Sequence, residues 1–121
     1  MYVLIAGGGR TGARLASLLL NENYKVRLIE NRRNLLTLLH QELPTEVIYE
    51  GNPIDPSVLE AVGIREAHVV ASVTSDDSMN LAISFLAKKM FDVPRTIARV
   101  NNPNNAWLFD EKFNVDVSLD Q

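Results

Sequence analysis

The chain has 121 residues, of which 46% are apolar and 22% charged, the balance of an ordinary globular protein with room for a real core. Its formal net charge is −3 and no long basic run appears, which argues against a nucleic-acid-binding protein. Because it has no cysteine, disulfides, thiolate metal sites and cysteine nucleophiles are excluded.

No basic leader precedes the first apolar run, and that run is far shorter than a signal core or a membrane span. We therefore expect a cytoplasmic protein without direct membrane insertion. Such a protein can still work peripherally at the inner membrane by docking on a partner.

The chain opens with an apolar run, a glycine cluster and a helical pattern. Residues 2–6 predict a central strand buried on both faces, because the run does not alternate. Gly7, Gly9 and Gly12 fit the pattern G-x-G-x-x-G. The first glycine allows a tight turn, the second lets the backbone approach a pyrophosphate, and the third lets the helix pack closely on the strand. The helix predicted at 10–23 aims its free N–H groups at the phosphates. A purely structural turn is the alternative interpretation.

Strands and helices alternate along the rest of the chain. Further strands are predicted at 25–30, 46–49, 67–73, 95–100 and 115–119. Four further helices are predicted. The first follows an Asn31 cap and runs to about residue 42, the second covers 56–62, the third runs from the turn at 74–77 to 90, and the fourth from the turn at 101–103 to 112. Asp55 with Pro56 predicts a helix start and Gly63 its end, while Ser75 is expected to cap the helix that ends at 90.

This alternation requires parallel strands joined by right-handed crossovers. We predict an α/β fold, a doubly wound, parallel, six-stranded Rossmann sheet in the order 3-2-1-4-5-6, with helices on both faces. Residues 1–121 are expected to form one nucleotide-binding domain.

An acidic residue ends the second predicted strand. In this fold a carboxylate there accepts hydrogen bonds from the ribose hydroxyls of adenosine, so Glu30 favours NAD or adenine mononucleotides over NADP. Arg32 and Arg33 follow, and a guanidinium there could bind a 2′-phosphate. A solvated helix start is the preferred interpretation of both arginines.

The other strand ends on this edge are also polar. Asn52 and Pro53 follow the third strand, where adenine would lie; Thr74 follows the fourth, and Arg99 lies near the end of the fifth. Ligands of open parallel sheets bind in this crevice. Each residue alone is equally typical of a turn or a surface.

Signs of catalysis are weak. His40 lies late in a helix and His68 at the opposite edge of the sheet, and no His, Asp and Glu cluster has metal-ligand spacing. We predict no enzyme activity, no catalytic residue and no metal. The alternative is an NAD-linked oxidoreductase or its cofactor-binding domain, which would need a substrate pocket and an acid–base group.

The last two predicted helices carry more apolar residues than a surface helix needs. In the helix ending at 90, the residues expected to face the sheet are Leu81, Phe85 and Leu86, and Met79, Ile83, Met90 and Phe91 widen the apolar arc. At least one residue of the run 107–109 should point away from the core. This favours a protein interface.

Three segments resemble a known family in the same order along the chain: GNPIDPSVLE at 51–60, VVASVTSDDSMNL at 69–81 and ARVNNP at 98–103. They look like the nucleotide-binding N-terminal domain of TrkA and KtrA proteins, the RCK or KTN domain. The resemblance covers nearly the whole chain. It implies a regulatory module of potassium uptake transporters or channels that binds NAD(H), ATP or ADP. It also implies a homodimer, or a ring of dimers, that gates a membrane subunit through ligand-dependent packing.

The resemblance also assigns roles to residues. By position, the phosphates would be held by Gly7, Gly8, Gly9, Arg10, Thr11 and Gly12, the ribose by Glu30 and Asn31, the adenine by Asn52 and Pro53, and the phosphate end would be completed by Thr74 and Arg99.

Two departures from the family stand out. The family usually has Asp where this chain has Asn52, which affects the choice of nucleotide. The C-terminal ligand-sensing domain that often follows is not in this sequence, as expected of either a piece of a longer protein or a stand-alone module with a separate partner. A nucleotide-binding adaptor unrelated to ion transport remains a further alternative.

Overall fold

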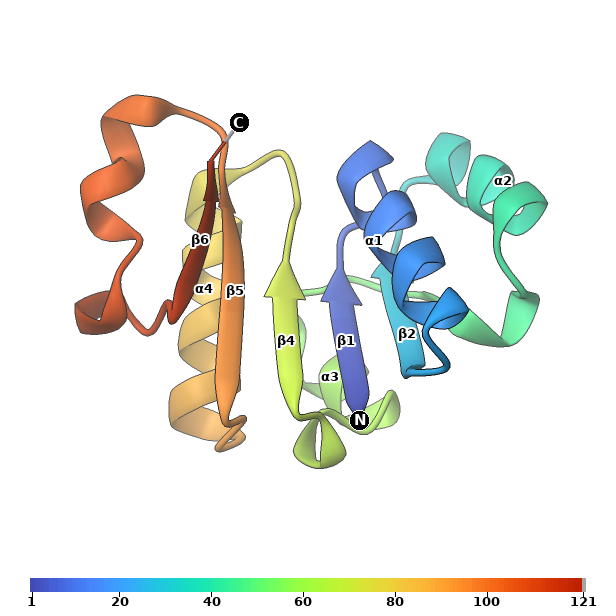
Figure 1. Ribbon diagram of the computed structural model, residues 1–121, viewed down its shortest axis with the longest axis horizontal. Coiled ribbons are helices and arrows are strands. Elements are labelled where there is room, and N and C mark those ends of the chain that lie inside the picture. The colour runs from blue at the N-terminus through green and yellow to red at the C-terminus, as the bar shows by residue number, and fades with distance from the viewer. Residues whose placement is uncertain (121) are drawn as a thin grey trace.

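The computed structural model describes residues 1–120, which form a sheet of six strands with helices around it (Figure 1). The strands are β1 (Tyr2–Ala6), β2 (Lys25–Glu30), β3 (Ile48–Glu50), β4 (Val69–Ser72), β5 (Arg95–Val100) and β6 (Val117–Asp120). All neighbouring pairs are parallel, in the order β3-β2-β1-β4-β5-β6, which confirms the predicted topology. The order reverses between β1 and β4, so the crevice of this fold opens at the carboxyl ends of these two strands.

Helices cover both faces of the central strands. The α-helices are α1 (Arg10–Asn21), α2 (Arg33–Glu42), α3 (Pro56–Ala61) and α4 (Asp77–Phe85), and shorter turns are the 3-10 helices η1 (Thr45–Val47), η2 (Ile64–Glu66), η4 (Pro103–Leu108) and η5 (Glu111–Phe113) and the π-helix η3 (Leu86–Met90). Alternate β1 residues enter two hydrophobic clusters, Leu4 with α3 and α4, and Ile5 with α1 and α2. Every residue of β1 is therefore buried, as its uninterrupted apolar run predicts.

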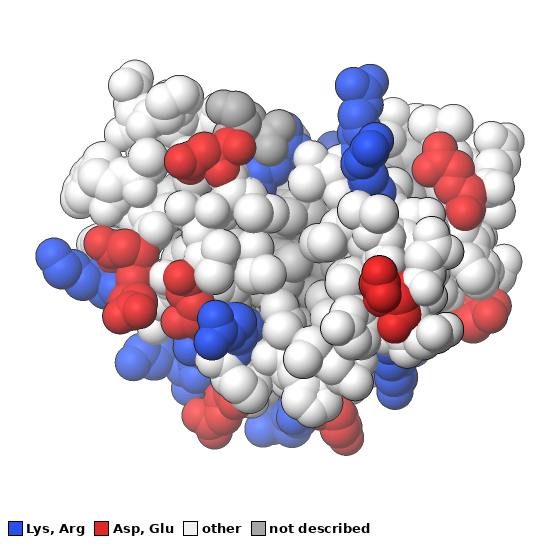
Figure 2. Space-filling view, in the orientation of Figure 1, with Lys and Arg blue, Asp and Glu red and all other residues white. Residues whose placement is uncertain are grey.

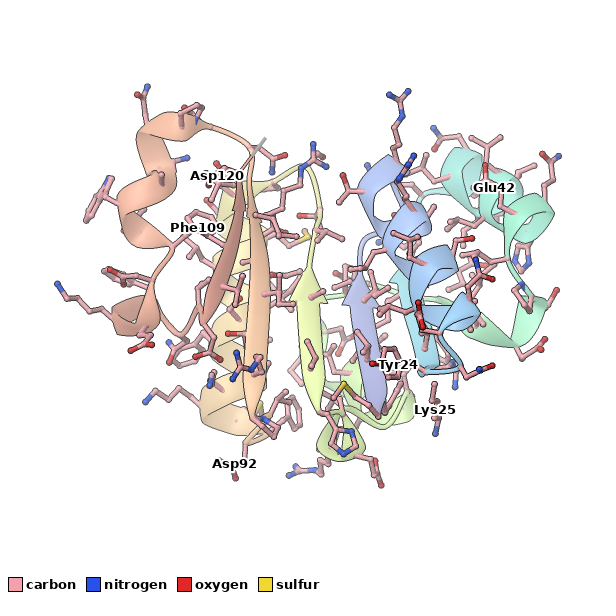
Figure 3. All side chains as sticks on the ribbon, viewed as in Figure 1. Tyr24, Lys25, Glu42, Asp92, Phe109 and Asp120 are labelled. Carbon is pink, nitrogen blue, oxygen red and sulfur yellow. The ribbon has the colours of Figure 1, made fainter. Side chains whose placement is uncertain are left out.

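A third, smaller cluster closes the β6 edge. Phe109 leaves the η4 segment and points toward the sheet (Figure 3), where it packs with Ala98, Val100 and Val115. Trp107, two residues earlier, is 71% exposed. The prediction that at least one residue of 107–109 points away from the core is thus confirmed.

Two predicted helix caps are confirmed and two are wrong. Asp55 accepts a hydrogen bond from the Ser57 N–H at 2.9 Å, and Gly63, with φ of 80°, follows the end of α3. Asp76, not Ser75, caps α4 by accepting from the Met79 N–H at 3.2 Å.

Asn31 makes no cap either. The N-terminal residue of α2 is preceded by Arg32, which has no side-chain cap bond. The Glu30 carboxylate accepts from the N–H groups of Asn31 and Arg32, both at 2.9 Å, so the two residues before α2 are bound to the end of β2.

The predicted helix through residue 112 is two short 3-10 helices, η4 and η5. The Asn102 and Asp110 side chains accept from the N–H groups two residues on, at 3.0 and 2.9 Å, and Asn114 has a positive φ of 69°. Such local bonds compete with a continuous α-helix, so the segment breaks at each of them.

Of the three residues predicted to face the sheet, Leu81 and Leu86 pack against the hydrophobic clusters, but the prediction for Phe85 is wrong. Phe85 is 53% exposed, whereas the buried residues of α4 are Asn80, Ile83 and Ser84. The helix buries two polar residues because both are hydrogen-bonded inside the protein, as the site below shows. Beyond Phe85 the helix continues as the π-helix η3 rather than as an α-helix to residue 90.

Three predicted strands begin two residues too early, and one of them is β4, which starts at Val69. β3 starts at Ile48, because η1 occupies the preceding residues. β6 starts at Val117, because Val115 is buried in the third cluster and the Asp116 carboxylate accepts from the Thr96 N–H at 2.8 Å. The β6 boundary is thus set by contacts with other segments, which the local pattern does not contain.

Candidate functional site

The glycine loop joins β1 to α1 with almost no free space on its inner side. Gly7 has φ of 112°, a conformation that L side chains rarely adopt. A Cβ at Gly12 would lie 1.9 Å from the Gly7 carbonyl oxygen, so the helix packs against the turn more closely than any side chain allows. These two glycines are required by the fold itself.

Gly9 is different, because a Cβ there would have no described atom within 4 Å. Its φ of −72° and ψ of −168° are open to other residues. Gly9 is the N-cap of α1, which has no side-chain cap bond and no acidic residue in its first turn. The positive end of the α1 dipole therefore faces open space beside Gly9.

Glu30 lies at the carboxyl end of β2 and is only 2% exposed. Its Oε1 atom accepts from the Gly8 N–H at 2.7 Å, which ties the glycine loop to β2. Burial by itself raises the pKa of Glu30, but hydrogen bonds from the Arg32 side chain and from the backbone of Arg32 and Gly8 outweigh it and lower the pKa to about 2. The carboxylate is therefore ionised at neutral pH.

Arg32, which the sequence analysis did not include among the predicted site residues, lines the cavity beside Glu30. Its guanidinium donates from Nη2 to Glu30 Oε1 at 2.9 Å and from Nε to Oε2 at 3.0 Å, a bidentate ion pair. The preferred interpretation of Arg32 as a solvated helix start is wrong for its side chain, although 46% of it stays exposed. The sequence signal that could have predicted this ion pair is an arginine two residues after the glutamate that ends β2.

Across the crevice, Thr74 follows β4 and is held by Asn80, which is fully buried. The Thr74 hydroxyl and N–H both donate to Asn80 Oδ1, at 2.6 and 3.0 Å. The Asn80 amide donates in turn to the carbonyls of Thr74 and Arg99, both at 3.0 Å. Asn80 thus fixes the ends of β4 and β5. The sequence signal that could have predicted this role is a polar residue within an otherwise apolar helix.

Asp77 joins the start of α4 to the loop after β5. Its carboxylate accepts from the N–H groups of Asn101 and Asn102 at 2.7 and 2.9 Å and from the Asn105 side chain at 2.9 Å. Burial raises the pKa of Asp77, but these bonds outweigh it and the net shift is downward. Asp77 is therefore a bridge between the start of α4 and the loop after β5.

A cavity of about 230 Å³ lies between these two sides. Six of the predicted site residues line it, together with four others; the predicted ones are Gly7, Glu30, Asn31, Asn52, Pro53 and Thr74, and the additional ones are Arg32, Ser75, Asp76 and Met79. The structure thus brings residues from four separate loops to one place, at the edge where the parallel strands end.

The remaining predicted site residues lie elsewhere. Gly8, Gly9 and Arg10 line a larger hollow of about 530 Å³ between α1 and α2, and Figure 2 shows basic side chains projecting over α1 at this edge of the sheet. Thr11, Gly12 and Arg99 line neither space. The glycine loop therefore separates the two spaces.

Residues 3–119 match the family model of the TrkA-N domain. The chain belongs to the TrkA-N family. This confirms the family predicted from the three sequence segments.

Named relatives of this TrkA-N domain are potassium uptake proteins. It is 38% identical over 119 residues to the Trk system potassium uptake protein TrkA of Mycobacterium tuberculosis strain H37Rv, covering 98% of this chain and 53% of that protein. It is 40% identical over 116 residues to the TrkA homolog of Methanothermobacter thermautotrophicus, covering 96% and 52%. The chain thus spans about half the length of these curated relatives.

Among solved structures, the GsuK channel bound to NAD aligns with a TM-score of 0.81 and 23% identity, over 98% of this TrkA-N domain and 20% of that chain. GsuK bound to ADP aligns with the same TM-score and identity, over 98% and 30%. At this level of identity the likeness shows the shared fold.

The histidines of the TrkA-N domain do not line the cavity. His68 accepts from the Tyr2 N–H at 3.0 Å where β1 begins, the edge that Lys25 and Asp92 mark in Figure 3. Within residues 1–120, no group of three or more His, Asp or Glu side chains could hold a metal ion. No helix in the same part of the chain is both long enough and apolar enough to cross a bilayer.

Proposed function

We propose that this TrkA-N domain binds an adenine nucleotide, NAD(H), ATP or ADP, at the carboxyl edge of its sheet. The observation that carries the proposal is Gly9, the loop glycine at which a Cβ would have no described atom within 4 Å. The packing of the fold requires glycine at Gly7 and Gly12 but not at Gly9, and a glycine at Gly9 suits the close approach of a group from outside the chain. The pyrophosphate of a dinucleotide or the phosphates of ATP or ADP fit that position.

The other groups follow from the geometry of the crevice. The phosphates would lie at Gly9, Arg10 and Thr11, where the α1 dipole and a guanidinium favour an anion. Glu30 and Asn31 would receive the ribose.

The far end of the ligand would lie against the walls of the cavity. Asn52 and Pro53 would border the adenine, and the phosphate end would be completed by Thr74, which lines the cavity, and by Arg99, which lies outside its lining. The Thr74 hydroxyl is engaged with Asn80, so we expect Thr74 to shape the crevice rather than to reorient toward a ligand.

We further propose that the bound nucleotide regulates a membrane potassium transporter or channel. The names of the relatives support this, and so do the solved complexes of GsuK, a channel, with NAD and with ADP. The domain would act without catalysis, by biasing how two protomers pack. A gene for a potassium pore subunit beside this one would favour the proposal over an adaptor unrelated to ion transport.

A set of exposed apolar side chains suits a dimer face. They lie on α4, η3, η4 and η5 and are Phe85, Met90, Trp107 and Phe113, between 42% and 71% exposed. Trp107 and Phe113 contact each other edge to face, with ring centroids 6.4 Å apart. Exposed aromatic residues of this kind are enriched at protein interfaces.

The test is calorimetric titration of the purified chain with NADH, NAD, ATP, ADP and NADPH, with molecular mass measured in solution alongside. Saturable binding of at least one of the first four, and a dimer whose assembly changes with that ligand, is the expected result. Absence of binding to all five would contradict nucleotide binding, and a monomer in every condition would contradict the dimer.

A further inference from the structure

The oxygen atoms of Glu30 have no capacity left for a ligand. Oε1 accepts from the Gly8 N–H at 2.7 Å and from Arg32 Nη2 at 2.9 Å. Oε2 accepts from the N–H groups of Asn31 and Arg32, both at 2.9 Å, and from Arg32 Nε at 3.0 Å. A carboxylate offers about four lone-pair sites, and five donors already share them.

Three of these donors cannot leave. The N–H groups of Gly8, Asn31 and Arg32 are backbone, fixed by the glycine loop and by the start of α2, so releasing them would open local structure. The two guanidinium donors can leave, because the Arg32 side chain is 46% exposed and hangs on rotatable bonds. Arg32 also lines the same cavity as Gly7 and Thr74.

A ribose brings two neighbouring hydroxyls and needs two acceptor positions on the carboxylate. The bidentate guanidinium occupies one position on each oxygen, which is the pattern that a ribose diol would use. An adenosine ligand that reaches Glu30 must therefore first displace the side chain of Arg32.

We propose that Arg32 is an affinity-setting residue that competes within the chain for the ribose-binding carboxylate. This rests on the proposed nucleotide function and deepens it. In the free protein Arg32 holds Glu30, and in the bound protein the ribose replaces it. The exchange weakens every ligand that uses an adenosine ribose, and it makes release of Arg32 part of binding.

The first test compares wild type, Arg32→Met and Arg33→Met by calorimetric titration with ADP and NADH. Methionine keeps the length of the side chain and the backbone N–H but removes both guanidinium donors. Arg32→Met is expected to bind about two- to tenfold more tightly, the range of a partly exposed ion pair. Arg33 is exposed and has no hydrogen bond to Glu30 in the described structure, so Arg33→Met should bind as wild type does.

The outcomes separate this inference from the function on which it rests. If wild type binds and Arg32→Met binds equally or more weakly, the competitor role is overturned while nucleotide binding stands. If only Arg32→Met binds measurably, both are supported. If no variant binds ADP or NADH, the nucleotide function fails and the competitor role fails with it.

A second measurement follows the arginine directly. The Nε–H signal of Arg32 in the NMR spectrum of the wild-type chain should be protected from exchange without ligand, because this N–H donates to Glu30. Saturation with ADP should remove that protection. Protection that persists at saturation would show that Arg32 stays on Glu30 and would overturn the exchange.

Discussion

The two sides of the crevice hold their polar groups in different ways. On the β2 side, the Glu30 carboxylate is buried, but two of its five hydrogen bonds come from the side chain of Arg32, which is 46% exposed. On the β4 side, Thr74 is held by Asn80, which is fully buried and hydrogen-bonded to two strand ends.

The difference indicates which side can adjust. A partly exposed partner can leave into water at small cost, whereas a buried one cannot leave without opening the core. We therefore expect the β4 side to be a fixed wall and the β2 side to rearrange when a ligand arrives. The glycine loop shows the same contrast on a smaller scale, since Gly12 is tightly packed and Gly9 is open.

Gly12→Ala is expected to have the largest effect, because the new methyl group would lie 1.9 Å from the Gly7 carbonyl oxygen. We expect a loss of about 4 kcal/mol in the free energy of unfolding, or failure to fold. Chemical denaturation measures it, with Gly9→Ala as the matched control, expected to lose less than about 1 kcal/mol. Equal losses of stability at the two positions would contradict the difference in packing between Gly12 and Gly9.

Asn80→Leu tests the fixed wall. Leucine fills a similar volume but removes all four hydrogen bonds that the Asn80 amide makes with the Thr74 hydroxyl and N–H and with the carbonyls of Thr74 and Arg99. The expected loss is about 3 kcal/mol, measured by the same denaturation. Asn21→Ala, at the exposed end of α1, is the control and should stay within about 0.5 kcal/mol. A tolerated leucine would contradict the rigidity of the β4 side.

Glu30→Gln has a smaller effect that depends on pH. The pKa of Glu30 is lowered from 4.5 to about 2, so folding favours its ionised form. That stabilisation is complete above pH 4.5 and is lost as the pH falls toward 2. At pH 7 the variant should be less stable by about 2 kcal/mol. In denaturation curves, the difference in free energy of unfolding between wild type and variant should shrink as the pH falls across this range. A difference that does not change with pH would show that it does not arise from the charge of Glu30.

Much of the fold could be predicted because its signals are local. The uninterrupted apolar run of β1, the glycine spacing and the Asp55 with Pro56 helix start each depend on a few consecutive residues. The alternation of strands and helices then leaves few topologies, and the predicted strand order is the observed one.

The errors fall where a distant partner decides. Phe85 was expected to face the sheet because it is apolar, but α4 turns Asn80 and Ser84 inward, where Ser72 and Thr74 supply hydrogen-bond partners. The Arg32 ion pair depends on how the chain turns after β2, which the residue pattern does not fix. The gathering of loops into one cavity follows from the topology, while the contacts of each site residue with a ligand stay predictions.

Titrating wild type and Gly9→Val with ADP and with NADH, while monitoring the thermal stability of both, tests the central claim most directly. A Cβ at this position has no described atom within 4 Å, and the valine side chain would block the approach of a phosphate to the loop. We predict saturable binding to wild type, and no detectable binding to a Gly9→Val variant that still folds. A folded Gly9→Val protein that binds as tightly as wild type would contradict a nucleotide site at the glycine loop.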